Sequence, residues 1–298
     1  MNAKYYLAVI VAFVIYGLFS LPLKSIDNYA SLDILLSRLV IASVLIVLVS
    51  LIFRRKISLE NISIFINSTK SERRRLLIVN VVSSIMLAVN WYLFIYVMNN
   101  VSVNATSLAY MLCPIITTIL AYIFLKDRLS VVQWGAIGLS VFSCVLLAFG
   151  NFMDVFYSFV IGLSYAIYLV LQKSNQKLDR FFTLTFQIVV GTLLLLPFFQ
   201  YQQPEPEKGL YFFWIVFLIA ALFTIIPMFL NVYSLNKLNS STAGIFIYMN
   251  PIISFFLALY YFKEEMDDTK IIAYMIVFFS VVLFNAKIIS QLLRFKKA

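Results

Sequence analysis

The stretch LAYMLCPIITTILAYIFLKDRL, residues 108–129, returns in altered form as IFIYMNPIISFFLALYYFKEEM, residues 245–266. At a constant offset of 137 residues, Pro114 aligns with Pro251 and Lys126 aligns with Lys263. Between residues 96 and 126, the other identities at this offset are Tyr96 with Tyr233, Asn99 with Asn236, Ile115 with Ile252, Ile116 with Ile253, Leu120 with Leu257 and Ala121 with Ala258. Two unrelated apolar segments would rarely align a proline together with its polar neighbours, so the sequence predicts an internal repeat.

The chain is far more apolar than a soluble protein of its length. It has 298 residues, of which 63% are hydrophobic and only 12% are charged. A soluble domain carries about a quarter charged residues, whereas apolar stretches of about 20 residues, enough to cross a bilayer, recur here along the whole sequence. The expected fold class is an all-α polytopic membrane protein. Ten transmembrane helices are expected at about 5–23, 32–53, 76–98, 103–125, 131–149, 153–171, 182–199, 211–234, 242–262 and 270–290.

The repeat divides these ten spans into two halves. Residues 1–149 are expected to form the first five-helix repeat (spans 1–5), and residues 150–298 the second (spans 6–10). Because five is odd, the second half enters the membrane in the opposite orientation, which is the inverted-topology repeat found in secondary transporters. The expected architecture is therefore 5+5, with the second repeat inverted in the membrane.

The distribution of positive charge predicts the orientation. With the N-terminus placed in the cytoplasm, eighteen Lys and Arg side chains fall on the cytoplasmic side, and only Lys24, Lys208, Lys263 and Lys270 fall outside. Cytoplasmic loops of membrane proteins carry such an excess, so both termini are expected in the cytoplasm. The net charge of +10 then indicates topology rather than a nucleic-acid-binding surface.

Three connections hold much of the remaining polar sequence. Residues 54–75, RRKISLENISIFINSTKSERRR, are compatible with a small interfacial helix or with a plain basic loop. Residues 200–209 are expected to form an exposed turn. The acidic residues of 264–268 are expected to lie in a solvated outer loop.

The absence of histidine excludes several chemistries at once. Without it there is no Ser-His-Asp or Cys-His catalysis, no HExxH zinc site and no histidine proton relay. Cys113 and Cys144 both fall in apolar segments, so we expect small buried side chains rather than a disulfide or a metal site. No enzymatic activity, cofactor or metal is expected.

The first half resembles a known transporter family. The stretches YGLFSLPLKSI (16–26), SLDILLSRLV (31–40) and 90–143, which begins NWYLFIYVMNNVSVNATSLAYMLCPIITT, are similar to the RarD branch of the EamA family in the drug/metabolite transporter superfamily. The resemblance implies a 5+5 carrier of small metabolites or amino-acid-like compounds, often an exporter, in the bacterial cytoplasmic membrane, with a central cavity between the halves. Ala105, Cys113 and Ser37 stand where that branch carries Glu, Asn and His.

One face of each repeated helix carries small and polar residues. Steps of three and four residues place Ser107, Tyr110, Cys113, Thr117 and Ala121 on one face of the first helix. Their equivalents in the second are Gly244, Ile247, Asn250, Ser254 and Ala258. In hydrocarbon such a face lines a cavity or packs tightly against another helix, and both interpretations stay open. The substrate-binding candidates are Ser107, Tyr110, Thr117, Asn250 and Ser254.

Asparagine and aromatic side chains add candidates on neighbouring spans. Asn90 and Asn231 are expected to face inward, because an asparagine side chain is costly in lipid. Trp91, Tyr110 and Tyr248 could stack on a ligand, although ordinary packing or a position at the membrane interface explains each of them as well.

Arg38 is the one charge well inside a predicted span, about two turns from its outer end. A charge in the membrane is a candidate functional group by default. Asp33, five residues earlier, is a possible partner at a spacing that is not ideal. A structural ion pair and an anchor for a substrate carboxylate or phosphate both stay open. Leu184 aligns with Arg38 in the second half, so the symmetry of the fold does not require the charge.

Three prolines lie inside predicted spans. Pro114, Pro251 and Pro227 are expected to kink their helices, because proline cannot donate a backbone hydrogen bond and its ring clashes with the preceding turn. The matched pair Pro114 and Pro251 could also act as hinges during alternating access.

These observations favour a carrier for small molecules in the lipid bilayer. A membrane-embedded transferase or a lipid-handling protein is the alternative, although acid–base groups for a transferase are lacking. No acidic residue lies near the middle of a span, which favours facilitated diffusion or exchange, with Asp33 as the only plausible proton site. A monomer or a homodimer is expected. Gly135 and Gly138 could serve a dimer contact, but packing within the chain is the favoured interpretation.

Overall fold

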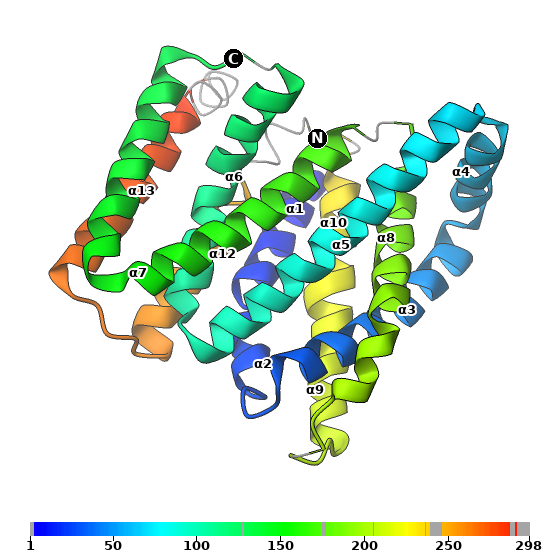
Figure 1. Cartoon of the computed structure of the whole chain (residues 1–298), viewed down its shortest axis with the longest axis horizontal. Helices are drawn as coiled ribbons and strands as arrows, with labels where there is room; N and C mark the ends of the chain where they lie inside the picture. Colours follow the sequence, from blue (N-terminus) through cyan, green and yellow to red (C-terminus); the bar gives the residue numbers. More distant parts are fainter. Residues whose placement is uncertain are drawn as a thin grey trace.

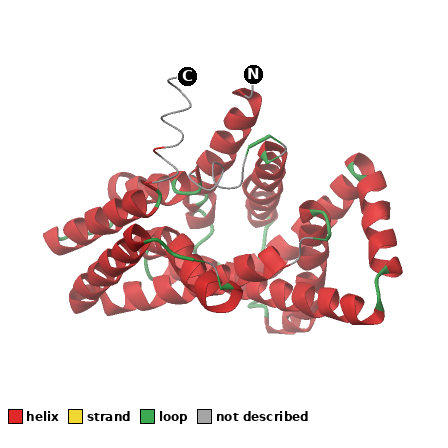
Figure 2. Cartoon of the chain, turned by 90° about the horizontal axis from the view of Figure 1, so that it is seen from above, coloured by secondary structure: helices red, strands yellow, loops and turns green. Residues whose placement is uncertain are grey.

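A computed structural model of the chain describes residues 3–126, 128–174, 177–204, 206–235, 237–238, 246–286 and 290. Every regular element among these residues is a helix, and loops join the helices (Figure 2). The α-helices are α1 (Ala3–Gly17), α2 (Ser20–Lys24), α3 (Ser31–Phe53), α4 (Arg55–Asn67), α5 (Lys70–Asn100), α6 (Val103–Leu125), α7 (Val131–Ser174), α8 (Arg180–Leu195), α9 (Leu210–Ala220), α10 (Ile226–Ser234), α12 (Met249–Phe256) and α13 (Asp268–Phe284). Three further segments are the 3₁₀ helix η1 (Leu196–Tyr201) and the π-helices η2 (Ala221–Ile225) and η3 (Leu257–Tyr261).

Within the described residues, seven helical stretches are long and apolar enough to cross a membrane. They are Lys4–Lys24, Ser31–Phe53, Lys70–Asn100, Val103–Phe124, Val131–Lys173, Arg180–Tyr201 and Leu210–Ser234, and Met249–Tyr261 is a shorter apolar helix. The start of the expected span 242–262, part of 270–290 and both chain ends lie outside the described residues. The fold is that of an all-helical, multi-pass membrane protein.

The longest helix, α7, consists of two arms. Asn151 interrupts it with non-helical backbone angles of φ −141° and ψ 51°. Figure 1 shows the two arms meeting at a bend, with one arm against α13 and the other crossing the middle of the molecule. The interruption predicted between 149 and 153 falls at this bend.

Polar residues mark where several helices begin. Thr69 and Glu72 form a reciprocal capping box at the start of α5. The Ser102 hydroxyl accepts a hydrogen bond from the backbone N–H of Ala105 at the start of α6, and Asp179 and Asp267 cap α8 and α13 in the same way.

The region between α3 and α5 is helical. Residues 55–67 form α4, so the helical alternative for this connection is correct. Leu59, Ile62, Ile64 and Ile66 are exposed on α4.

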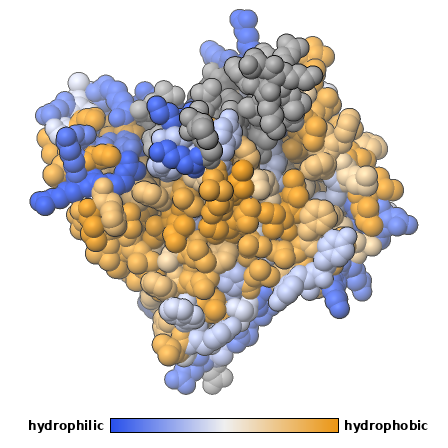
Figure 3. Space-filling model, turned by 180° about the vertical axis from the view of Figure 1, so that it is seen from behind, coloured by the Kyte–Doolittle hydropathy of each residue, from blue (hydrophilic) through white to orange (hydrophobic). Residues whose placement is uncertain are grey.

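The surface has the polarity expected of a membrane protein. Figure 3 shows a broad apolar band across the molecule, with polar groups gathered at its margins. Many of the largest apolar side chains are exposed, among them Phe53, Phe149 and Trp214. Contiguous exposed apolar surface of this kind is matched to lipid rather than to water.

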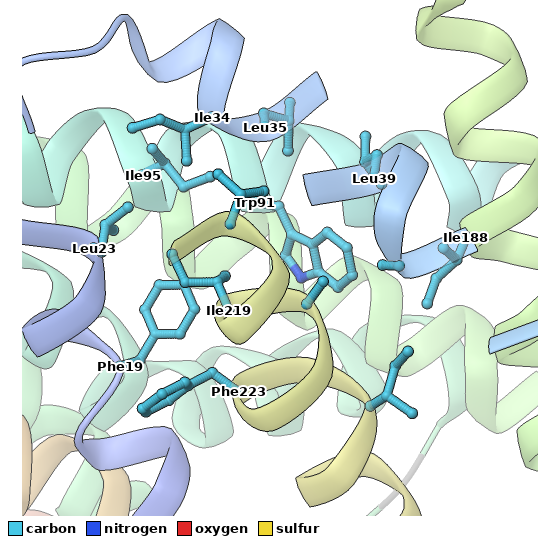
Figure 4. Close-up of a cluster of buried hydrophobic side chains, with 14 of the residues drawn as sticks. Phe19, Leu23, Ile34, Leu35, Leu39, Trp91, Ile95, Ile188, Ile219 and Phe223 are labelled. Atoms are coloured by element: carbon cyan, nitrogen blue, oxygen red, sulfur yellow. The ribbon is translucent and has the colours of Figure 1, made fainter. Parts of the chain in front are cut away.

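The largest cluster of buried apolar side chains joins distant parts of the sequence. It includes Phe19 before α2, Trp91 of α5 and Phe223 of η2, together with Leu39 and Ile188 from α3 and α8 (Figure 4). Two rings of this cluster, those of Phe19 and Trp91, lie against the charged side chain of Arg38.

Candidate functional site

Arg38 of α3 is buried inside the protein, with only 5% of its surface exposed. Its guanidinium lies over the Trp91 ring at 4.2 Å from the centroid and over the Phe19 ring at 5.0 Å. Its Nη2 donates to Thr224 Oγ1 at 3.0 Å. No hydrogen-bond acceptor among the described residues meets its Nε. Arg38 is thus held by aromatic faces and one hydroxyl, and its Nε–H is a buried donor without a partner among the described residues.

The Phe19 ring beside this guanidinium belongs to a network of aromatic side chains from both halves of the sequence. Tyr110 packs against Phe94 at 5.3 Å and against Tyr165 at 5.7 Å between ring centroids. Phe19 contacts Phe94 and also Phe223, at 5.6 and 6.1 Å. Arg38, Trp91 and Tyr110, three predicted site residues, therefore lie together with Tyr165 of α7 and with Phe223 and Thr224 of η2. We call these six residues the central aromatic site.

The hydroxyl that meets Arg38 comes from a break in the helical pattern. Thr224 lies in the π-helix η2, and its Oγ1 donates to the Ile219 carbonyl oxygen, five residues earlier, at 2.9 Å. Pro227 follows in the first turn of α10, where it cannot donate to a preceding carbonyl. Short π-helical turns are frequent at functional sites, and this one presents Thr224 to Arg38.

Three predicted site residues connect helices. Asn90 Nδ2 donates to the Ile161 carbonyl oxygen and to Ser164 Oγ of α7, both at 3.0 Å. Ser107 Oγ of α6 donates to the Pro251 carbonyl oxygen of α12 at 2.7 Å. Ser254 Oγ of α12 donates to the Gly17 carbonyl oxygen of α1 at 3.1 Å.

The hydrogen bonds given below for the other predicted site residues do not involve Arg38. Thr117 donates to the Cys113 carbonyl oxygen of its own helix at 2.7 Å. The Tyr248 hydroxyl accepts from Asn285 Nδ2 at 3.2 Å. Asn250 and Asn231 are half-buried, and Asn250 Oδ1 accepts from Ser254 Oγ at 3.5 Å.

The prolines occupy different helical contexts. Pro114 lies inside the continuous helix α6. Pro251 lies in the first turn of α12, and Gly244 falls outside the described residues. A hinge role for these prolines stays a prediction.

Asp33 does not pair with Arg38. Its Oδ2 lies 3.1 Å from Lys208 Nζ, in the connection between η1 and α9. A second ion pair joins Asp179, the N-cap of α8, to Arg54 at the end of α3, at 3.2 Å. Since the Asp33 carboxylate is already bound to a lysine, the suggested partner for Arg38 was wrong.

Glu264 is not simply part of a solvated loop. Its Oε1 and Oε2 accept from the backbone N–H groups of Val103 and Asn104 at 2.5 and 3.0 Å. These N–H groups begin α6, where a carboxylate is stabilised by the helix dipole.

Gly135 and Gly138 do not show the close packing within the chain that was expected, because a Cβ added to either would meet no atom within 4 Å.

The sequence analysis did not predict a series of hydrogen-bonded polar side chains beside the site. Gln172 Nε2 donates to the Tyr168 hydroxyl at 2.8 Å and to Gln187 Oε1 at 3.0 Å. Gln187 Nε2 in turn donates to Asn80 Oδ1 at 3.0 Å. The signal was available, because a glutamine inside an apolar span needs an internal partner.

Comparisons with known proteins place this sequence among transporters. The sequence pattern of the EamA-like transporter family matches residues 3–149 and again residues 153–286. An uncharacterised transporter of Bacillus subtilis, YojE, is 26% identical over 280 residues, covering 92% of this chain and 91% of that protein. Protein RarD of Streptomyces exfoliatus is 30% identical over 205 residues, covering 66% of this chain and 64% of that protein. A solved crystal structure shares the fold, with a TM-score of 0.64 at 11% identity, covering 95% of this chain and 98% of that one.

Fold and sequence thus define a multi-pass membrane transporter. The chain belongs to the EamA-like transporter family, and its relatives named RarD support the RarD-like branch.

Proposed function

We propose that the protein is a secondary carrier or facilitator with ten transmembrane helices in a 5+5 inverted repeat, divided at residues 149 and 150. It exports small metabolites, amino-acid-like or amphipathic, across the bacterial cytoplasmic membrane by alternating access around the central aromatic site. The observation that carries this proposal is Arg38, a buried charge held among aromatic rings from both halves of a transporter-family chain.

Matched backbone geometry supports the repeat. Among the described non-glycine residues, only Lys126 and Lys263 have positive φ, at 57° and 53°. They are aligned at the offset of 137 residues, and each follows the same helix of its half. A left-handed residue outside glycine is uncommon, so its occurrence at both aligned positions favours two copies of one unit.

Matched close packing supports it as well. A Cβ on Gly17 of α1 would lie 2.6 Å from Ile253 Cβ, and a Cβ on Gly162 of α7 would lie 3.1 Å from Ile116 Cδ1. Ile116 and Ile253 are aligned residues of the repeat. Each glycine therefore packs its helix against the repeated helix of the other half, as a twofold relation between halves requires.

The placement of the connections supports the proposed topology. In Figure 1 the N-terminal end of α1, helix α4 and the α6–α7 connection lie along one edge of the molecule. The α2–α3 connection, the start of α9 and the loop after η3 lie along the opposite edge. The first edge holds most of the positive charge and is proposed to be cytoplasmic, with both termini.

Within this carrier, Arg38, Trp91 and Tyr110 are proposed to contact the substrate. Asn90, Ser107 and Ser254 are proposed to hold the helices that move, since each bonds a different helix. The proposed partners are the substrate and the bilayer, for a monomer or a homodimer and without nucleic acid.

Purified protein in liposomes tests the function. Counterflow of radiolabelled compounds, competed by amino acids, nucleosides and amphipathic drugs, should show saturable transport of at least one class, and inside-out vesicles should show accumulation for an exporter. Chemical conversion of a substrate, or lipid movement without solute transport, would instead favour the transferase or lipid-handling alternative.

A further inference from the structure

We propose that the substrate is an organic monoanion, whose carboxylate binds Arg38 while an apolar or aromatic body packs against the half-buried aromatic rings near it. This inference rests on the proposed carrier function and names the chemical class that its central site accepts.

The charge of Arg38 has no counterion in the part of the chain that the structure describes. Among the described residues, the ion pairs join Lys24 to Asp27, Arg54 to Asp179, Lys177 to Glu72 and Lys208 to Asp33, and none involves Arg38. Its electrostatic neighbours are the phenol groups of Tyr16 and Tyr110. A buried cation is costly without a partner, so this site favours binding of a negative charge.

The donors of Arg38 fit a carboxylate. A guanidinium binds a carboxylate through two parallel N–H groups, and its Nε–H belongs to one such pair. Thr224 receives a bond from Nη2, whereas Nε meets no acceptor among the described residues. The unused donor of a side chain that is 95% buried is therefore available to a ligand oxygen.

The balance of charge selects among anions. One carboxylate neutralises the site, whereas a dianion would leave one negative charge in it. A zwitterion would bring an ammonium group, and the described carboxylate nearest in sequence, that of Asp33, is already bound to Lys208. The site therefore prefers a carboxylate without an amino group, which is narrower than the amino-acid-like class.

The surrounding rings select an apolar body. Tyr16, Phe94, Tyr110 and Tyr165 are only half-buried, so part of each residue remains accessible. Aromatic faces favour flat or apolar groups in stacked or edge-to-face geometry. A ring linked to a carboxylate would satisfy both features of the site.

Three probes that share a phenyl ring test the inference. Phenylacetate is an anion, phenylalanine a zwitterion and phenethylamine a cation at neutral pH. Trp134 and Trp214 are exposed, so the pair of changes Trp134→Phe and Trp214→Phe leaves Trp91 as the sole tryptophan reporter in the full-length protein. Quenching of its fluorescence gives a Kd for each probe. Phenylacetate should bind at least about tenfold more tightly than the other two, as expected for a charge-assisted hydrogen bond.

Variants at Arg38 test whether the preference for phenylacetate comes from the guanidinium of this residue. Arg38→Gln should weaken phenylacetate binding about tenfold or more, and Arg38→Lys should restore part of it because the charge returns without the planar fork. Thermal melting of each variant checks its folding. Equal affinity for the three probes in the otherwise unchanged protein, or unchanged phenylacetate binding in folded Arg38→Gln, would overturn the inference. Counterflow of another compound class would then leave the carrier function standing, whereas no counterflow of any compound would remove that function itself.

Discussion

Helices α3 and α8 pack against each other and occupy equivalent places in the two proposed repeats, yet their centres differ. Asp33 at the start of α3 pairs with Lys208, which follows α8 in the sequence. Asp179 at the start of α8 pairs with Arg54, which follows α3. Between these crossed ion pairs, α3 carries Arg38 where α8 carries Leu184. Features present in both halves therefore stabilise the fold, whereas the unmatched charge is the candidate for substrate recognition.

The largest expected effect comes from making α3 resemble α8 at this position. Arg38→Leu should lower transport in proteoliposomes by about 10- to 100-fold, because it removes a charge-assisted contact to the substrate. The matched control is Leu184→Met, a volume-conserving change at the aligned position, which should leave transport near the wild-type rate. Equal losses in the two variants would contradict the assignment of the unmatched residue to substrate binding.

The two crossed ion pairs should differ in strength. Lys208 and Asp33 have exposed side-chain fractions of 17% and 2%, whereas Arg54 and Asp179 have 16% and 27%. Lys208→Met leaves a buried carboxylate unpaired and should cost about 3–5 kcal/mol. Arg54→Met should cost less, because Asp179 Oδ1 still accepts from the N–H groups of Phe181 and Phe182. Denaturation in detergent compares them, and a larger loss for Arg54→Met would refute this ranking.

The glycine contact at the α1–α12 crossing should have an intermediate effect. Gly17→Ala places a methyl group against the branched carbon of Ile253 and should lower the free energy of unfolding by about 1–3 kcal/mol. Gly135→Ala is the control, because its added methyl group meets no atom within 4 Å. A second change, Ile253→Ala, should recover part of the loss in Gly17→Ala. Without that recovery, the effect would not come from this contact.

The smallest effect is expected at the exposed pair Glu72 and Lys177. The hydrogen bond from Lys177, followed by that from the Thr69 backbone, lowers the pKa of Glu72. A carboxyl group whose folded pKa is depressed contributes stability above its unfolded pKa and loses it as the pH falls through the folded pKa. Glu72→Gln should therefore melt slightly below wild type at neutral pH and coincide with it in acid. An equal difference in melting temperature between Glu72→Gln and wild type at neutral and at acid pH would contradict this assignment.

Several features of the molecule could be predicted from sequence, and others could not. The apolar spans, the break near Asn151 and the position of Arg38 inside a long apolar helix follow from local composition. The partners of Arg38 and Asp33 do not, because Thr224 and Lys208 are distant in sequence and meet them only through helix packing. The same holds for Glu264, whose helix-capping role depends on a helix from the other half. Gly17 and Gly162 are 145 residues apart, so the constant offset of 137 residues does not pair them.

The inverted repeat is the claim on which the comparison of α3 with α8 depends, and cysteine labelling tests it most directly. Arg128 and Glu265 are aligned at the offset of 137 residues, and both are exposed. Single cysteines are introduced as Arg128→Cys or Glu265→Cys in a protein with Cys113→Ala and Cys144→Ala, and intact cells are treated with a membrane-impermeant maleimide. The account predicts that the cysteine at 265 reacts in intact cells, whereas the one at 128 reacts only after permeabilisation. Reaction of both from the same side would contradict it.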